Sequence, residues 1–198
     1  MPSSYADVLE NRISTETRPV EFDIGGGHYA IPRNYLYQMD DWNGGRQDVV
    51  SIRLDYPTLR PAEERNKDCF FQKKVCRLYD VVLLNSAMET TEIFLNMTKL
   101  FREPYPKHGP YGLELYEVGP ESARQQFYRK VIDGRSIVFI CDSFDNGGRH
   151  DAVCHNVTRT RSGAALSYYF PLEDLHDAVS INKKLNNLIN LFSFRGKR

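Results

Sequence analysis

Four cysteines are the side chains of this sequence with the most reactive chemistry. They fall in two close pairs, Cys69 with Cys76 and Cys141 with Cys154, at separations of seven and thirteen residues. A structural zinc site usually takes cysteines about two to four residues apart, so this spacing suits zinc poorly. It favours two local disulfides, while free buried thiols and zinc remain the alternatives. Two disulfides would imply an oxidising compartment.

Histidine and carboxylate spacing gives no sign of a catalytic or metal site. The histidines are His28, His108, His150, His155 and His176. They are scattered, and the sequence has neither an HExxH pair nor a GxSxG nucleophile elbow. Residues 142–148 carry carboxylates and glycines but lack the calcium-loop order DxDxDG, which favours an Asx-rich turn. We therefore expect no metal, no cofactor and no catalytic residue, and hence a protein that is not an enzyme.

Aromatic and acidic side chains gather in one short segment after residue 34. They are Tyr35, Tyr37, Asp40, Asp41 and Trp42. Tyrosine and tryptophan are common anchors of protein interfaces, and neighbouring carboxylates attract a basic partner. The cluster is the predicted partner-binding site. The alternative is local packing, with Trp42 folded back over the core.

Charge and composition narrow the class of protein. Lys plus Arg and Asp plus Glu number 26 each, so the formal net charge is 0, and this lack of a basic excess argues against a nucleic-acid partner. Hydrophobic residues make up 41% of the 198 residues, enough for a packed core. We expect no membrane span, because no apolar run reaches about eighteen residues. No signal peptide is visible, which suits a cytosolic protein or a mature exported one.

A glycine triplet marks the clearest structural signal. Apolar and polar residues alternate over 20–24, three glycines follow at 25–27, and the alternation resumes at Tyr29 and Ile31. Glycine tolerates the positive φ of a tight reversal, so the pattern predicts a β-hairpin. A phosphate-binding loop is the weaker interpretation, because the triplet lacks the GxxxxGK[ST] form. Pro32 predicts a short helical turn after the second strand.

The rest of the chain predicts further hairpins and two helices. Strands are expected over 49–54, 77–84 and 113–118, hairpins over 127–141 and 153–170, and helices over 87–102 and 172–192. The four apolar residues 81–84 predict burial on both faces of their strand. Residues 86–89 have the form of a capping box. Residues 142–151 are expected to form a polar loop, and 69–76 a short hairpin or a stapled excursion.

These elements predict one α+β domain. It has a mainly antiparallel sheet built from hairpins, with a mid-chain helix and a C-terminal helix packed on it. We expect the domain to cover 19–194, after a polar lead-in over 1–18 and before a basic tail over 195–198.

Three segments together resemble small exported proteins of Gram-negative bacteria. Residues 22–36 read FDIGGGHYAIPRNYL and match the pattern F-x-I-G-G-x-x-Y-x-I-P-x-N-Y-L of that group. Residues 137–154 add a strand and two cysteines around a polar loop, and residues 166–194 add a Tyr/Phe strand and a terminal helix. Many proteins of this group look like lipoproteins or periplasmic immunity proteins carried beside type VI secretion effectors.

The resemblance implies a periplasmic immunity protein. Such a protein binds a cognate secreted toxin through exposed loops and blocks the toxin's active site; a lipid anchor on the full-length protein would also fit the group. This sequence departs from the group because it shows neither a signal peptide nor a lipobox cysteine. The alternative prediction is a periplasmic envelope domain that recognises a glycan or another small molecule, with Trp42 and nearby tyrosines as a stacking platform.

Overall fold

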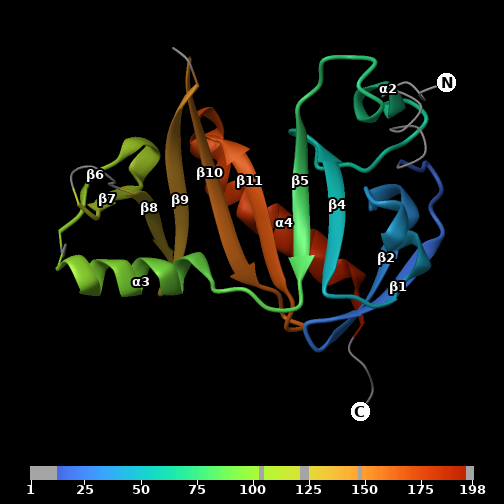
Figure 1. Ribbon diagram of the computed structural model, residues 1–198, viewed down its shortest axis with the longest axis horizontal. Helices are drawn as coiled ribbons and strands as arrows, with labels where there is room; N and C mark the ends of the chain where they lie inside the picture. The colour runs from blue at the N-terminus through green and yellow to red at the C-terminus, as the bar shows by residue number, and fades with distance from the viewer. Residues whose placement is uncertain (1–12, 103–104, 121–124, 147–148, 195–198) are drawn as a thin grey trace. The chain divides into compact units, whose positions relative to one another are not determined.

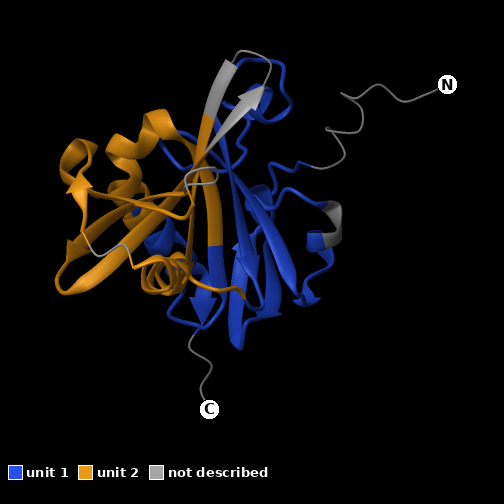
Figure 2. Cartoon of the chain, turned by 60° about the vertical axis from the view of Figure 1, so that its left-hand side comes forward, with its two compact units in different colours: residues 1–86, 159–166, 184–198 blue, residues 87–158, 167–183 orange. Residues whose placement is uncertain are grey.

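The computed structural model describes residues 13–102, 105–120, 125–146 and 149–194, except for the side chains of 39–40 and 143–151. The lead-in before residue 13 and the tail 195–198 therefore lie outside the described residues. Contacts group the chain into two compact units. Unit 1 comprises residues 1–86, 159–166 and 184–198, and unit 2 comprises residues 87–158 and 167–183 (Figure 2).

Unit 1 is built mainly from paired strands. Its elements are β1 (Pro19–Ile24), β2 (Gly27–Pro32), β3 (Gly45–Arg46), β4 (Val49–Asp55), the short helix α2 (Lys67–Phe70), β5 (Leu78–Leu84) and β12 (Ser193–Phe194). One sheet has the strand order β12-β2-β1-β3, and β4 pairs antiparallel with β5 (Figure 1).

The hairpin predicted around the glycine triplet is confirmed. β1 and β2 pair antiparallel from Pro19 opposite Pro32 to Ile24 opposite Gly27. Gly25 and Gly26 make the turn at φ values of +59° and +80°. A Cβ added at Gly25 would lie 2.4 Å from a backbone atom of the 159–166 segment, so this position requires glycine for space as well as for φ.

Unit 2 holds the longer sheet and the mid-chain helix. Its elements are α3 (Thr90–Phe101), β6 (Lys107–His108), β7 (Glu114–Val118), β8 (Gln125–Ile132) and β9 (Arg135–Asn146), together with most of β10 (Arg149–Arg159) and β11 (Ala165–Pro171) and the start of α4 (Ala178–Phe192). The strand order within the unit is β11-β10-β9-β8-β7-β6. The pairs from β6 to β10 are all antiparallel. The fold class predicted from the sequence, α+β with mainly antiparallel strands, a mid-chain helix and a C-terminal helix, is confirmed.

The prediction of a polar loop over 142–151 is wrong. β9 continues to Asn146 and β10 starts at Arg149, so that the two strands form one long hairpin. Cys141 lies directly opposite Cys154 in this ladder. Backbone pairing with a neighbouring strand accepts polar side chains, so the polar composition of this segment is a poor guide to where its strands end.

Two further expectations are corrected. β5 buries Tyr79, Val81 and Leu83 but exposes Asp80, so it is buried on one face only. The capping box lies three residues later than predicted, because the Glu89 side chain caps α3 and the Glu92 side chain accepts the Glu89 N–H. The helix consequently begins at Thr90 rather than at residue 87.

Apolar side chains of α3 form the core of unit 2 with β7, β8 and β9. The members of this cluster are Phe94, Tyr116, Val118, Phe127, Val138 and Ile140. The rings of Phe94 and Tyr116 meet edge to face, with centroids 4.8 Å apart. In Figure 1, α3 lies below β7, β8 and β9 and runs across the direction of these strands.

A chain of buried polar side chains crosses the same unit. Asn156 donates from Nδ2 to the Val138 carbonyl at 2.7 Å and to Thr90 Oγ1 at 3.0 Å. Its Oδ1 accepts from Asn182 Nδ2 at 2.9 Å, and the Asn182 amide also reaches the Tyr168 hydroxyl at 3.1 Å. Burial raises the pKa of Tyr168 above its ordinary value. We call these four side chains, Thr90, Asn156, Tyr168 and Asn182, the polar network.

Candidate functional site

Residues 33–43 carry the predicted partner-binding cluster, and β4 holds this segment in place. The Tyr37 N–H donates to the Ser51 carbonyl at 3.0 Å. The Asp41 carboxylate accepts a hydrogen bond from the Ser51 N–H at 2.9 Å. Asp41 is only 5% exposed, so its carboxylate supports the backbone of β4.

Trp42 is half-buried, and a guanidinium group covers its ring. The Arg33 guanidinium carbon lies 4.0 Å from the ring centroid of Trp42. The same guanidinium donates to Glu16 Oε2 at 2.7 Å. This combination of an ion pair and a cation–π contact fixes the orientation of the indole.

Tyr37 has a similar cover on the neighbouring strand. The Arg53 guanidinium carbon lies 3.4 Å from the ring centroid of Tyr37. Arg53 also makes two hydrogen bonds to the Asp80 carboxylate, at 2.5 and 2.7 Å. Because Arg53 and Asp80 face each other across β4 and β5, the register of the strand pair determines these two hydrogen bonds.

Tyr35 packs against the end of α4. Its ring meets that of Phe192 edge to face, with centroids 4.9 Å apart. Burial, and secondarily the negative charge of Glu63, raises the pKa of the Tyr35 hydroxyl above its ordinary value.

The structure thus places the predicted residues on one supported segment with different surroundings. Tyr35, Tyr37 and Trp42 are half-buried and Asp41 is buried, while the side chain of Asp40 lies outside the described residues. Sequence reasoning missed the two arginines that cover the aromatic rings. Only the β4 register brings position 53 to Tyr37, so local spacing holds no signal for that contact. Whether this segment binds a partner stays a prediction.

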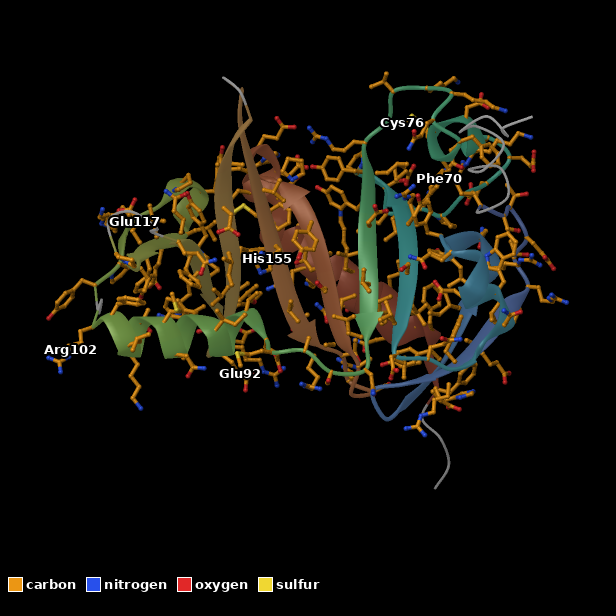
Figure 3. The ribbon with its side chains drawn as sticks, viewed as in Figure 1. Phe70, Cys76, Glu92, Arg102, Glu117 and His155 are labelled. Carbon is orange, nitrogen blue, oxygen red and sulfur yellow. A yellow bond between two sulfur atoms is a disulfide. The ribbon has the colours of Figure 1, made fainter. Side chains whose placement is uncertain are left out.

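Both predicted cysteine pairs are disulfide-bonded. Cys141 and Cys154 join paired positions of β9 and β10, where both are buried. Cys69, which lies in α2, and Cys76 close a small loop that starts within this helix. The two bonds therefore have different settings, one inside a ladder and one at the surface. Figure 3 labels Cys76 on that loop, with Phe70 of α2 close by.

A pocket of about 380 Å³ opens beside the β1–β2 turn in unit 1. Its lining residues are Asp23, Ile24, Gly25, Gly26, Gly27, His28, Arg46, Gln47 and Asn85. His28 Nδ1 lies 2.9 Å from Asp23 Oδ1, and Asn85 Oδ1 accepts the Gly25 N–H at 3.1 Å. The side chains that line the pocket include neither a hydroxyl nor a thiol, so the histidine–aspartate pair has no serine, threonine, tyrosine or cysteine beside it in that lining. Sequence reasoning did not find this pocket.

Two features are absent from the described part of the chain. Within it, no group of three or more His, Cys, Asp or Glu side chains is arranged to hold a metal ion. Among the same residues, no helix combines the length and apolar content needed to cross a bilayer.

Comparison with known proteins shows the fold. No protein-family model and no curated protein sequence matches the chain. The chain is similar to the iron-regulated outer membrane lipoprotein FrpD of Neisseria meningitidis, with a TM-score of 0.63 and 16% identity over 91% of this chain and 97% of that chain. It is also similar to Smlt3025, an immunity protein of the Stenotrophomonas maltophilia type IV secretion system. That match has a TM-score of 0.60 and 13% identity, over 90% of this chain and 94% of that chain.

Proposed function

We propose that this chain is an immunity protein, which binds a secreted antibacterial toxin and blocks the toxin's active site. The observation that carries the proposal is the fold shared with Smlt3025 along nearly the whole of both chains. Residues 22–36 resemble small exported proteins of Gram-negative bacteria, many of which look like lipoproteins or periplasmic immunity proteins, and this resemblance also supports the proposal. Neither neighbour is described as an enzyme.

The disulfides support an oxidising compartment as the place of action. A cytosolic protein would usually keep its cysteines reduced, whereas both pairs here are bonded. The neighbour FrpD is an outer membrane lipoprotein. We therefore place the protein in the periplasm or elsewhere in the envelope.

The secretion system that delivers the toxin is the finer part of the proposal. The sequence resemblance points to type VI effectors, while the neighbour Smlt3025 belongs to a type IV system. Both systems deliver proteins, so a protein partner is common to the two possibilities. The identity of the captured toxin decides between them.

Inhibition by occlusion requires a rigid contact surface, and the 33–43 segment offers one candidate. The aromatic rings of Tyr37 and Trp42 are each held by a guanidinium group, so little side-chain freedom is lost when a partner covers them. Variants Tyr37→Ala and Trp42→Ala test this segment. Asp41 is unsuitable for that test, because removal of its carboxylate would also remove the hydrogen bond to Ser51.

No observation favours the alternative of a glycan-binding domain. That prediction requires Trp42 and neighbouring tyrosines to line a concave platform. The pocket described beside the β1–β2 turn is lined by none of them.

The test is capture followed by rescue. The folded, disulfide-bonded protein is immobilised, and envelope and secreted fractions of its source bacterium are passed over it under non-reducing conditions. A chain retained at a near one-to-one ratio is identified and expressed in the periplasm of a sensitive host. We expect this expression to stop growth, and co-expression of the immunity protein in the periplasm to restore it.

The compartment supplies the matched control. The same protein expressed in the cytoplasm should fail to protect against a periplasmic toxin. If the protein in the periplasm fails to restore growth against every toxin that it captures, the proposed function is wrong.

A further inference from the structure

Two rings lie together on the face of the unit 2 sheet that is opposite α4. Asn182 of α4 donates hydrogen bonds to the side chains of Asn156 on β10 and Tyr168 on β11. Successive side chains of a strand point to opposite faces, so the neighbouring residues His155 and Tyr169 lie on the other face. Their ring centroids are 5.4 Å apart, and Tyr169 is 56% exposed. Figure 3 labels His155 on β10.

A carboxylate on β9 lies on the same face as these rings. In the β9–β10 ladder Asp142 is opposite Val153 and Ile140 is opposite His155, so positions 142 and 155 share one face. The Asp142 carboxylate accepts a hydrogen bond from Gln125 Nε2 at 3.2 Å and has no ion pair with a described residue. We call Asp142, His155 and Tyr169 the Tyr169 cluster.

The chain combines an aromatic ring with a carboxylate twice elsewhere, and each time an arginine completes the set. The two sets are Arg53 with Tyr37 and Asp80, and Arg33 with Trp42 and Glu16. The guanidinium carbon lies 3.4 Å from the ring centroid in the first set and 4.0 Å in the second. A planar guanidinium makes both contacts at once, because its face stacks on the ring while its N–H groups donate to the carboxylate.

The Tyr169 cluster has the ring and the carboxylate, but among the described side chains no guanidinium covers it. Burial lowers the pKa of His155, against a smaller opposing effect of the Asp142 charge, so the imidazole is mainly neutral at pH 7 and does not repel a cation. Neighbouring strands are about 4.8 Å apart, which puts β9 and β11 about 10 Å apart across β10. A long side chain laid over His155 can therefore contact both Asp142 and Tyr169.

We propose that the Tyr169 cluster is a contact site for a protein partner and takes one arginine of that partner, which stacks on Tyr169 and His155 and donates to Asp142. The inference rests on the proposed immunity function, because the partner is then the toxin. It specifies the chemistry that the toxin presents at this contact. A lysine fits less well, because an ammonium group has no planar face.

A glycan is the competing occupant, since an exposed aromatic ring also offers a sugar a flat apolar surface. An uncharged sugar would take water away from Asp142 without supplying a positive charge, and an unpaired carboxylate that loses water costs free energy. A guanidinium supplies both the charge and the donors. Arginine is also enriched in the buried parts of protein interfaces.

The first experiment tests the ring at position 169 in the disulfide-bonded full chain. The probe is the toxin chain that the wild-type protein captures, and its affinity is measured for each variant. Tyr169→Leu removes the aromatic face and should lower the affinity about tenfold or more, whereas Tyr169→Phe keeps the face and should lower it less than about threefold. Tyr105→Leu is the matched control, because Tyr105 belongs to the same unit and is 84% exposed; it should also cost less than about threefold.

The second experiment tests the charge at position 142. Asp142→Asn removes the charge but still accepts the Gln125 hydrogen bond, and it should lower the affinity about 30-fold or more. The control Asp133→Asn, at an exposed turn that suits asparagine, should cost less than about threefold. Each arginine of the toxin is then replaced by alanine. For one of them the loss of affinity should be at least about fivefold smaller against Asp142→Asn than against the wild-type protein.

The outcomes separate the inference from the proposed function. If Tyr169→Leu and Asp142→Asn bind a neutralised toxin as tightly as the wild-type protein does, the Tyr169 cluster is not a contact site and the immunity function stands. Additive effects for every arginine of the toxin would overturn the arginine assignment. Failure of the wild-type protein to neutralise any toxin would overturn both proposals.

A sugar titration provides the last arm. Tri-N-acetylglucosamine is added to the wild-type protein and to Tyr169→Leu while the ring signals of His155 are followed by nuclear magnetic resonance. A saturable shift in the wild-type protein that is lost in Tyr169→Leu would assign the Tyr169 cluster to a glycan and overturn the protein contact. We expect no saturable shift in either protein.

Discussion

Truncation of Asn156 at the centre of the polar network should destabilise the protein strongly. Asn156 is 2% exposed and takes part in three hydrogen bonds, with Val138, Thr90 and Asn182. Each buried hydrogen bond contributes a net of about 0.5–1.5 kcal/mol. The Val138 carbonyl and the Asn182 amide each keep a second partner, Thr90 Oγ1 and the Tyr168 hydroxyl. We therefore expect Asn156→Ala to lower the free energy of unfolding by about 2–4 kcal/mol.

The assay is equilibrium unfolding in urea, followed by circular dichroism and by tryptophan fluorescence. The chain has 1 tryptophan, Trp42, which lies in unit 1, whereas the polar network lies in unit 2. Equal shifts of the two transitions would mean that the units unfold together. Asn96→Ala on the exposed surface of α3 is the matched control and should change stability by less than about 0.5 kcal/mol.

A double-mutant cycle isolates the contribution of the hydrogen bond between Asn156 and Thr90. Thr90→Val removes the hydroxyl that Asn156 reaches and keeps the side-chain shape, so the two substitutions should couple by about 0.5–3 kcal/mol. The reasoning fails if Asn156→Ala costs less than about 1 kcal/mol, or if the two substitutions are additive.

Two further predictions concern a titrating group and a turn. Burial lowers the pKa of His155 below 6.5, against a smaller opposing effect of Asp142, so the unfolded chain binds the proton more tightly. The stabilising contribution of neutral His155 is present above pH 6.5 and is lost as the pH falls toward the folded-state pKa. The variant His155→Gln should therefore reduce the slope of the free energy of unfolding against pH below pH 6.5. An unchanged slope would contradict the assignment of this pH dependence to His155. At the β1–β2 turn, Gly26→Ala meets open space and should cost only about 1–2 kcal/mol for its φ of +80°. Gly25→Ala should cost about 3 kcal/mol or more, because its Cβ would lie 2.4 Å from Ala164 Cα; equal thermal shifts of the two variants would refute this packing argument.

Local chemistry was enough to predict the turns and most of the strands. The glycine triplet and Asp133-Gly134 locate their hairpins because positive φ values are needed there, and the structure has Asp133 at +49° and Gly134 at +73°. The cysteine spacing likewise predicted two local bonds. In these cases the determining interactions lie within a few residues of each other.

The missed features depend on residues far apart in the chain. The extension of β9 and β10 past residue 142 follows from their pairing, and the cover of Tyr37 by Arg53 follows from the position of β4. The polar network needs four side chains that come from four different elements. Spacing along the sequence reports none of these contacts, because each is set by strand register and helix packing.

The candidate contact surfaces illustrate the same limit. The sequence predicts both Asp41 and Trp42 as interface residues. In the structure, however, the buried Asp41 carboxylate accepts a backbone hydrogen bond from Ser51, and the Arg33 guanidinium covers the Trp42 ring. Conversely, nothing in the spacing of Cys69 and Cys76 shows that Val75 between them is fully exposed. Only the structure shows which of these side chains are exposed.

Exposed side chains on fixed supports are where partner choice should lie in this fold. The chain shares the fold with two proteins at 16% and 13% identity, and those proteins are named as a lipoprotein and an immunity protein. A fold common to such different proteins cannot select a partner by itself. Buried groups such as the polar network maintain the fold but contact no partner. Val75 is fully exposed, so a substitution there should leave the free energy of unfolding nearly unchanged.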